Sequence, residues 1–174
     1  MLQPTFTFKQ LLENPNHLLA FGFGSGLAPK APGTVGTLAA IPLFIALSQL
    51  PYDIYLGVCL LTFLMGIPIC GASAKALGVK DHSGIVWDEF VGFWVTMAFV
   101  PALFSNELNT TDTLLYIAAG FVLFRLFDIA KPWPISWVDR NVEGGFGIML
   151  DDLLAGVLAA IGLVLIERFV FPLL

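Results

Sequence analysis

Two pairs of adjacent carboxylates, Asp88-Glu89 and Asp151-Asp152, stand at the beginnings of apolar segments in this 174-residue chain. A bilayer does not solvate ionisable side chains, so an acid at the edge of the hydrocarbon region usually has a function. A polar collar that merely marks the end of a helix is the alternative. Two acids together, the second pair directly behind a glycine cluster, favour a functional site over a collar.

The acids in this chain suit a divalent cation. Several carboxylates converging in poor solvent would repel one another unless some are protonated or a cation neutralises them. Oxygen ligands without histidine or cysteine at usable spacing favour a hard ion such as Mg²⁺. A network of ion pairs is the alternative, since Arg125 and Asp128 lie three residues apart on one helical face. The predicted catalytic residues are Asp88, Glu89, Asp128, Asp151 and Asp152, and the predicted metal ligands are Asp88, Glu89, Asp151 and Asp152.

A loop rich in glycine, proline and hydroxyl groups, residues 25–37, precedes the first long apolar segment. It matches neither a P-loop nor a dinucleotide fingerprint. Its free backbone N–H groups, hydroxyls and lysine before a helix nevertheless favour binding of an anion such as phosphate. Together with basic residues farther along the chain, it predicts a phosphate-bearing substrate. The predicted substrate-binding residues are Ser25, Lys30, Thr34, Thr37, Arg125, Lys131 and Arg140.

The composition is that of an integral membrane protein. Hydrophobic residues make up 57% of the chain and charged residues 12%, and the mean hydropathy is +0.87. A soluble domain is closer to half apolar and a quarter charged. The net charge of −5 is mild and no basic stripe occurs, which argues against a nucleic-acid partner.

The apolar segments predict an all-α, polytopic membrane bundle of about five transmembrane helices. We expect these helices near residues 35–50, 54–77, 85–104, 113–130 and 148–171. Residues 17–27 are apolar but rich in glycine, which indicates a re-entrant or interfacial segment. We expect residues 1–16 to form a cytoplasmic N-terminal arm and residues 17–174 a single membrane-embedded catalytic domain; the oligomeric state is left open.

The order of the helices places the motifs together. Helices one, three and five begin on the side of the membrane where helices two and four end. The glycine-rich loop and all the predicted catalytic acids therefore fall at one interface. Seven of the eight Lys and Arg residues lie on that side, which predicts that it faces the cytoplasm. Trp87, Trp133 and Trp137 are expected at the same depth, as interfacial aromatic residues.

These motifs resemble those of the phosphatidylglycerophosphatase A family of bacterial lipid phosphatases. The resemblance spans roughly residues 15–165. The stretches that carry it include Gly22-Phe23-Gly24-Ser25-Gly26, Pro32-Gly33-Thr34, Val86-Trp87-Asp88-Glu89, Phe124-Arg125, Phe127-Asp128, Lys131-Pro132-Trp133-Pro134, Asp139-Arg140-Asn141 and Asp151-Asp152.

The resemblance implies Mg²⁺-dependent removal of the terminal phosphate from phosphatidylglycerophosphate, on the cytoplasmic side of the bacterial inner membrane. Two other classes remain open at this point. An ion-coupled transporter would carry charges near the bilayer midplane, whereas the far halves of these segments are almost purely apolar. A metal-dependent lipid phosphotransferase would need a nucleotide-binding pattern, and none is found in the sequence.

Overall fold

The computed structural model describes residues 5–100, 104 and 109–169, and the regular structure of these residues is entirely helical. The predicted all-α class is therefore confirmed. The elements in chain order are α1 (Phe8–Glu13), α2 (Pro15–Ala20), the 3₁₀ segment η1 (Gly22–Leu27), α3 (Pro32–Leu47), α4 (Tyr52–Leu77), α5 (Trp87–Ala98), α6 (Thr110–Ala130), α7 (Ile135–Asn141) and α8 (Gly144–Phe169).

Among the described residues, three helices are long and apolar enough to cross a membrane: α4, α6 and α8. They coincide with the predicted segments 54–77, 113–130 and 148–171, although the last two residues of the third segment lie outside the described residues. The predicted segment 35–50 corresponds to α3, which is apolar but has only 16 residues. The lengths of α4, α6 and α8 therefore match the thickness of a bilayer.

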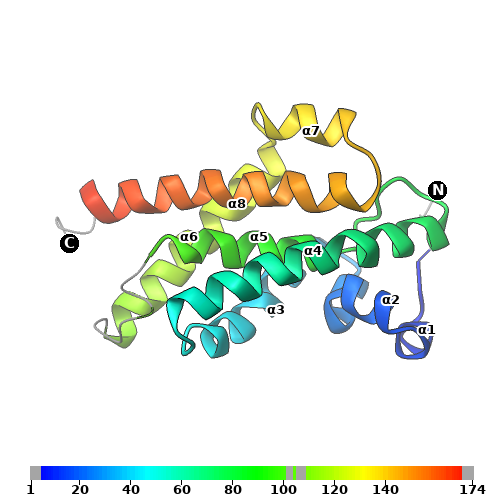
Figure 1. Ribbon diagram of the computed structural model, residues 1–174, viewed down its shortest axis with the longest axis horizontal. Coiled ribbons are helices and arrows are strands. Elements are labelled where there is room, and N and C mark those ends of the chain that lie inside the picture. The colour runs from blue at the N-terminus through cyan, green and yellow to red at the C-terminus, as the bar shows by residue number, and fades with distance from the viewer. Residues whose placement is uncertain (1–4, 101–103, 105–108, 170–174) are drawn as a thin grey trace.

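Helix α5 is shorter than the sequence suggested and lies in the centre of the bundle. Its 12 residues extend only about 18 Å, against roughly 30 Å for the hydrocarbon core of a bilayer. It packs against α3, α4, α6 and α8, and lies between α8 and α3 in Figure 1. Nearly all of its side chains are buried by protein. Its length is therefore set by its neighbours rather than by lipid.

The contact between α5 and α8 is close because glycines face each other. A Cβ atom on Gly156 would lie 2.4 Å from the carbonyl oxygen of Gly92. The Thr96 hydroxyl donates to the carbonyl oxygens of both glycines, at 3.0 and 3.2 Å. These glycines therefore serve helix packing, as small residues do in membrane proteins.

Helix α3 begins earlier than predicted. Pro32 occupies its first turn, where the fixed φ of proline and its missing N–H are favourable. Four residues predicted in a loop therefore belong to the first turns of the helix: Gly33, Thr34, Gly36 and Thr37. The preceding η1 segment contains Phe23 and Gly24 at φ 58° and 100°. It packs against α3 and brings the N-terminal part of the chain against the bundle.

The N-terminal helices are attached to α4. Helix α2 packs on α4, where His17 Nδ1 lies 2.8 Å from the hydroxyl of Ser73. Phe6 stacks on the His17 ring at 4.2 Å between centroids, and Leu11 of α1 is fully buried. These contacts order residues 6–20 against the rest of the protein.

Two features of residues 85–147 differ from the prediction. Helix α7, within the stretch predicted as a loop, buries Ile135 and Val138 and packs against α8 (Figure 1). Trp87, expected among the interfacial aromatic residues, is buried within the protein, and its Nε1 donates to the carbonyl oxygen of Thr62 at 3.2 Å. Trp133, by contrast, is 81% exposed.

Candidate functional site

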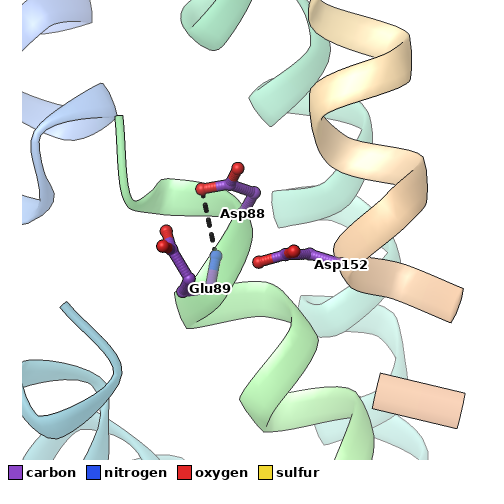
Figure 2. A group of neighbouring side chains, drawn as sticks. All are labelled: Asp88, Glu89 and Asp152. Atoms are coloured by element: carbon purple, nitrogen blue, oxygen red, sulfur yellow. Dashed lines mark hydrogen bonds between the residues drawn. The ribbon is translucent and has the colours of Figure 1, made fainter. Parts of the chain in front are cut away.

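Three carboxylates from two helices meet inside the bundle. Asp88 and Glu89 lie in the first turn of α5, and Asp152 projects toward them from α8 (Figure 2). One oxygen from each lies within 4.8 Å of the others. The residues are 8%, 9% and 3% exposed, respectively.

The crossing of α5 and α8 explains why these acids meet. Asp88 and Asp152 each precede by four residues the glycine at which the two helices touch. Each acid therefore lies about one helical turn from the contact, on the N-terminal side of it in both helices. Because α5 and α8 run in the same direction (Figure 1), contact at Gly92 and Gly156 brings these acids together.

Local backbone groups stabilise part of this negative charge. The Glu89 backbone N–H donates to Asp88 Oδ1 at 3.1 Å, the interaction drawn in Figure 2. The residue before α5, Val86, makes no side-chain cap, so a carboxylate in the first turn complements the free N–H groups there. On α8 the Asp152 N–H likewise donates to Asp151 Oδ1 at 3.1 Å.

The remaining oxygens of this cluster have the chemistry of cation ligands. Glu89 Oε2 and Asp152 Oδ2 are buried and have no hydrogen-bond partner among the described residues. Buried carboxylates in that state are costly unless they are paired or coordinate a metal. The cluster offers oxygen donors alone, which suits a hard divalent ion such as Mg²⁺ rather than zinc. The residues present thus fit a metal ion.

A second group of charges lies beside the cluster and is built around Arg125 of α6. Its Nη1 is 2.7 Å from Asp128 Oδ2 and 3.7 Å from Glu89 Oε1. The same nitrogen donates to the Thr37 hydroxyl at 3.5 Å, and Thr37 donates in turn to the Gly33 carbonyl at 2.9 Å. The buried Nε of Arg125 has no hydrogen-bond partner among the described residues. The guanidinium therefore has at least one N–H group, at Nε, that no described residue uses.

Gly33 allows α3 to approach this pair of charges. A Cβ atom at this position would lie 2.2 Å from Glu89 Oε1 and 3.1 Å from both terminal nitrogens of Arg125. The first turn of α3 has no side-chain cap, so its N–H groups remain available for an anion. The helix start, the arginine and the acids therefore lie side by side.

Lys131 is bound to two carboxylates. Its Nζ donates to Asp139 Oδ1 at 2.6 Å and to Asp151 Oδ2 at 2.5 Å, which ties the end of α6 to α7 and α8. Burial lowers the pKa of Lys131, but the Asp151 and Asp139 carboxylates outweigh that effect and raise its pKa above the ordinary value. Asp151, a predicted metal ligand, thus contacts Lys131, while its neighbour Asp152 joins the carboxylate cluster.

The other predicted substrate-binding residues lie at varied distances from these groups. Lys30 and Arg140 are exposed, and Thr34 is half-buried in the first turn of α3. The Ser25 hydroxyl donates to the carbonyl oxygen of Gly22 at 2.8 Å, within η1. The structure therefore brings Thr37 and Arg125 to the carboxylates, and gives Ser25 a local role in its turn.

Sequence reasoning missed the part played by Asp139. Its pairing with Lys131 depends on α7, which the sequence analysis treated as a loop. The signal available was the spacing of Ile135 and Val138, two apolar residues three positions apart after a proline.

Comparison with known proteins agrees with the motifs. The sequence model of the family described as Phosphatidylglycerophosphatase A matches residues 18–167. The Escherichia coli (strain K12) protein of that name is 50% identical over 149 residues, which cover 86% of this chain and 81% of the relative. The Haemophilus influenzae protein of that name is 48% identical over 151 residues, which cover 86% of this chain and 87% of the relative.

A further relative carries a different name. A Bacteroides thetaiotaomicron protein, provisionally named a phosphatidylinositol-3-phosphatase, is 40% identical over 159 residues, which cover 88% of this chain and 93% of the relative. No solved structure matches the chain significantly. The family match covers most of the chain, including every residue of the carboxylate cluster. The chain therefore belongs to the phosphatidylglycerophosphatase A family and is a phosphoric monoester hydrolase.

Proposed function

We propose that this protein removes the terminal phosphate of phosphatidylglycerophosphate in a Mg²⁺-dependent reaction at the cytoplasmic face of the bacterial inner membrane. The products are phosphatidylglycerol and inorganic phosphate. The observation that carries the proposal is the buried cluster of Asp88, Glu89 and Asp152, with two oxygens that have no hydrogen-bond partner among the described residues. The names of the relatives that are 50% and 48% identical supply the substrate.

The proposed metal ligands are Asp88, Glu89 and Asp152, with Asp151 close by on the next position of α8. When bound there, Mg²⁺ would polarise the phosphoryl oxygens and lower the pKa of a coordinated water. Mg²⁺ usually keeps several waters and takes only a few protein carboxylates, with substrate phosphate completing its shell. A cluster of three acids leaves room for that arrangement.

Arg125 is the proposed phosphate-binding cation. Asp128 and Glu89 hold its guanidinium in place, and the free Nε donor is available to a phosphoryl oxygen. A fixed cation beside the reacting phosphate stabilises the charge that moves to the leaving oxygen. The uncapped start of α3 would add backbone donors for the same phosphate. Lys131 acts indirectly in this proposal, by holding Asp151 against α7.

Phosphate release from purified protein tests the proposal. We expect the protein in detergent micelles to release phosphate from phosphatidylglycerophosphate with Mg²⁺, to stop in EDTA, and to recover when Mg²⁺ is added back. Asp53→Asn, a charge change at the far end of α4, serves as the matched control and should behave like wild type. Activity that persists in EDTA would refute the metal requirement, and preference for phosphatidylinositol 3-phosphate would assign the other substrate.

A further inference from the structure

A cavity of about 450 Å³ lies beside the carboxylate cluster and has no part in the mechanism above. It is bordered by the loop after α4, by α7 and by the first turns of α8, and is open on one side. Its polar wall is formed by Lys80 and by three carboxylates, those of Asp81, Asp139 and Asp151, and its apolar wall includes Val142 and Ile148.

The cavity is next to the proposed phosphate site. Asp151, in its wall, directly precedes Asp152, in the carboxylate cluster. Consecutive residues on a helix point about 100° apart, so α8 presents one acid to each side. A substrate whose phosphate lies at the cluster would therefore place the group attached to that phosphate at the mouth of the cavity.

The charges of the cavity do not suit a second anion. Its lysine, Lys80, is paired with Glu143 at 3.3 Å, and Lys131 is already bound by Asp139 and Asp151. The carboxylates thus outnumber the cations in and around the wall. A phosphate in the cavity would be repelled.

The cavity suits a neutral group that donates hydrogen bonds. Its volume far exceeds the space that one ion needs, and the ammonium of Lys131 already occupies the position between Asp139 and Asp151. Carboxylates are strong acceptors for hydroxyl donors, and aliphatic side chains suit the carbon skeleton of a small alcohol. An alcohol with a free hydroxyl combines both properties.

We propose that this cavity binds the hydroxyl-bearing alcohol of the leaving group, with Asp81 and Asp139 sharing, as a bifurcated hydrogen bond, the one proton that its free hydroxyl donates. For the proposed substrate, this alcohol is the headgroup glycerol between the two phosphates, so the inference rests on the proposed function. The two acids then select lipids by their headgroup, whereas the carboxylate cluster only requires a phosphate monoester.

A substrate analogue provides the test. We compare kcat/KM for phosphatidylglycerophosphate with kcat/KM for the same lipid in which propane-1,3-diol replaces the headgroup glycerol and only the free hydroxyl is missing. Loss of one hydrogen bond to a charged, partly exposed acceptor corresponds to about tenfold. We therefore expect wild-type protein in micelles with Mg²⁺ to prefer the natural headgroup by about tenfold.

Variants locate the source of this preference. Asp81→Ala and Asp139→Ala are each expected to narrow the ratio to below about threefold, because turnover of the natural lipid falls more than that of the analogue. Asp53→Ala, at the far end of α4, should keep the wild-type ratio. The ratio is insensitive to partial loss of folded protein, and the wild-type comparison needs no variant at all.

The possible failures are distinguishable. A wild-type ratio near one, or a ratio that both cavity variants retain, would overturn the inference while phosphate release upheld the proposed function. If wild-type protein released phosphate from neither lipid, the proposed function would fail and this inference with it.

Discussion

At the scale of single residues, the carboxylate cluster combines close like charges with deep burial. Asp152 is the most buried member, 3% exposed, and its Oδ2 has no hydrogen-bond partner among the described residues. Such an arrangement favours binding of a cation over stability of the metal-free fold. The same buried like charges therefore lower the stability of the metal-free protein and favour binding of a cation.

Replacing Asp152 should separate these two effects. In Asp152→Asn we expect turnover to fall at least about a hundredfold, since even the loss of a residue that only hydrogen-bonds to a metal ligand costs about 10- to 100-fold. Without metal, the thermal midpoint should be equal to or above that of wild type, because one of three like charges is gone. Added Mg²⁺ should raise the midpoint of wild type but not that of the variant, as measured by thermal unfolding in detergent.

A different pattern would contradict this assignment. If Asp152→Asn lost stability without metal and still responded to Mg²⁺, the residue would be structural. Asp53→Asn again provides the matched control, because it removes one exposed carboxylate far from the cluster.

Replacing Lys131 should lower the stability of the protein, whereas replacing Asp152 should not. In Lys131→Met, Asp139 and Asp151 lose a shared partner, and the Asp151 side chain is left only 9% exposed. Breaking a fully buried pair costs about 3–5 kcal/mol. Because the Lys131 side chain is 28% exposed, we expect a loss of about 1–3 kcal/mol in the free energy of unfolding.

Two measurements decide what Lys131 does. Lys131→Arg should recover most of the stability, since it keeps a cation between the two acids. If Lys131→Met instead left stability intact and only raised KM, Lys131 would contact the phosphate directly, as the sequence analysis predicted.

At the scale of elements, the contact between α5 and α8 determines the geometry of the site. In Gly156→Ala the new Cβ atom would meet the Gly92 carbonyl oxygen at 2.4 Å. Backbone cannot move aside as a flexible side chain can, so the helices must separate at a cost of about 1–3 kcal/mol. We expect a lower thermal midpoint and a weaker response to Mg²⁺, because Asp152 moves away from α5.

Gly57 provides the matched control for this prediction. A Cβ atom there meets nothing within 4 Å, so Gly57→Ala should keep or slightly raise the midpoint through helix propensity. An unchanged Mg²⁺ response in Gly156→Ala would show that the glycine contact does not position the carboxylates.

The elements also show what the sequence could predict. Helices α4, α6 and α8 were predictable because lipid requires about 20 apolar residues in succession. Helix α5 was not, because a helix surrounded by protein stays apolar on all sides at any length. The apolar stretch 85–104 therefore gave the presence of a helix but not its extent.

For the site, the sequence predicted which segments meet but not the direction of each side chain. The order of helices predicted that the glycine-rich segment and the acid pairs meet, and Gly33 does lie against Glu89 and Arg125. The direction of individual side chains was not predictable, since Asp151 and Asp152 are neighbours with equal chemistry. The crossing of α5 and α8 at Gly92 and Gly156 turns Asp152 toward α5, and α7, which carries Asp139, lies on the side where Asp151 contacts Lys131.

At the scale of the whole molecule, the carboxylate cluster lies near one end of the bundle. Asp152 is eight residues from the start of α8, about 12 Å along the axis. That depth is close to the headgroup region when α8 spans a bilayer. A lipid phosphate could thus reach the cluster while its acyl chains remained among the apolar faces of the long helices.

The orientation of this end can be measured directly. Helix α4, with 26 residues, is about 39 Å long, so its two ends should lie on opposite sides of the membrane. Lys80 follows the end near the carboxylate cluster and Asp53 lies at the other end. Because Lys and Arg residues gather at the end that bears the cluster, Lys80→Cys should react with an impermeant maleimide in inside-out vesicles and Asp53→Cys in right-side-out vesicles.

The native thiols should not interfere with this labelling, because Cys59 and Cys70 are both buried. Wild-type protein provides the background in each vesicle preparation. Labelling of Lys80→Cys from the periplasmic side would place the carboxylate cluster on the outer leaflet. The substrate would then have to cross the bilayer before hydrolysis, and the proposed cytoplasmic reaction would be wrong even if the chemistry at the cluster were right.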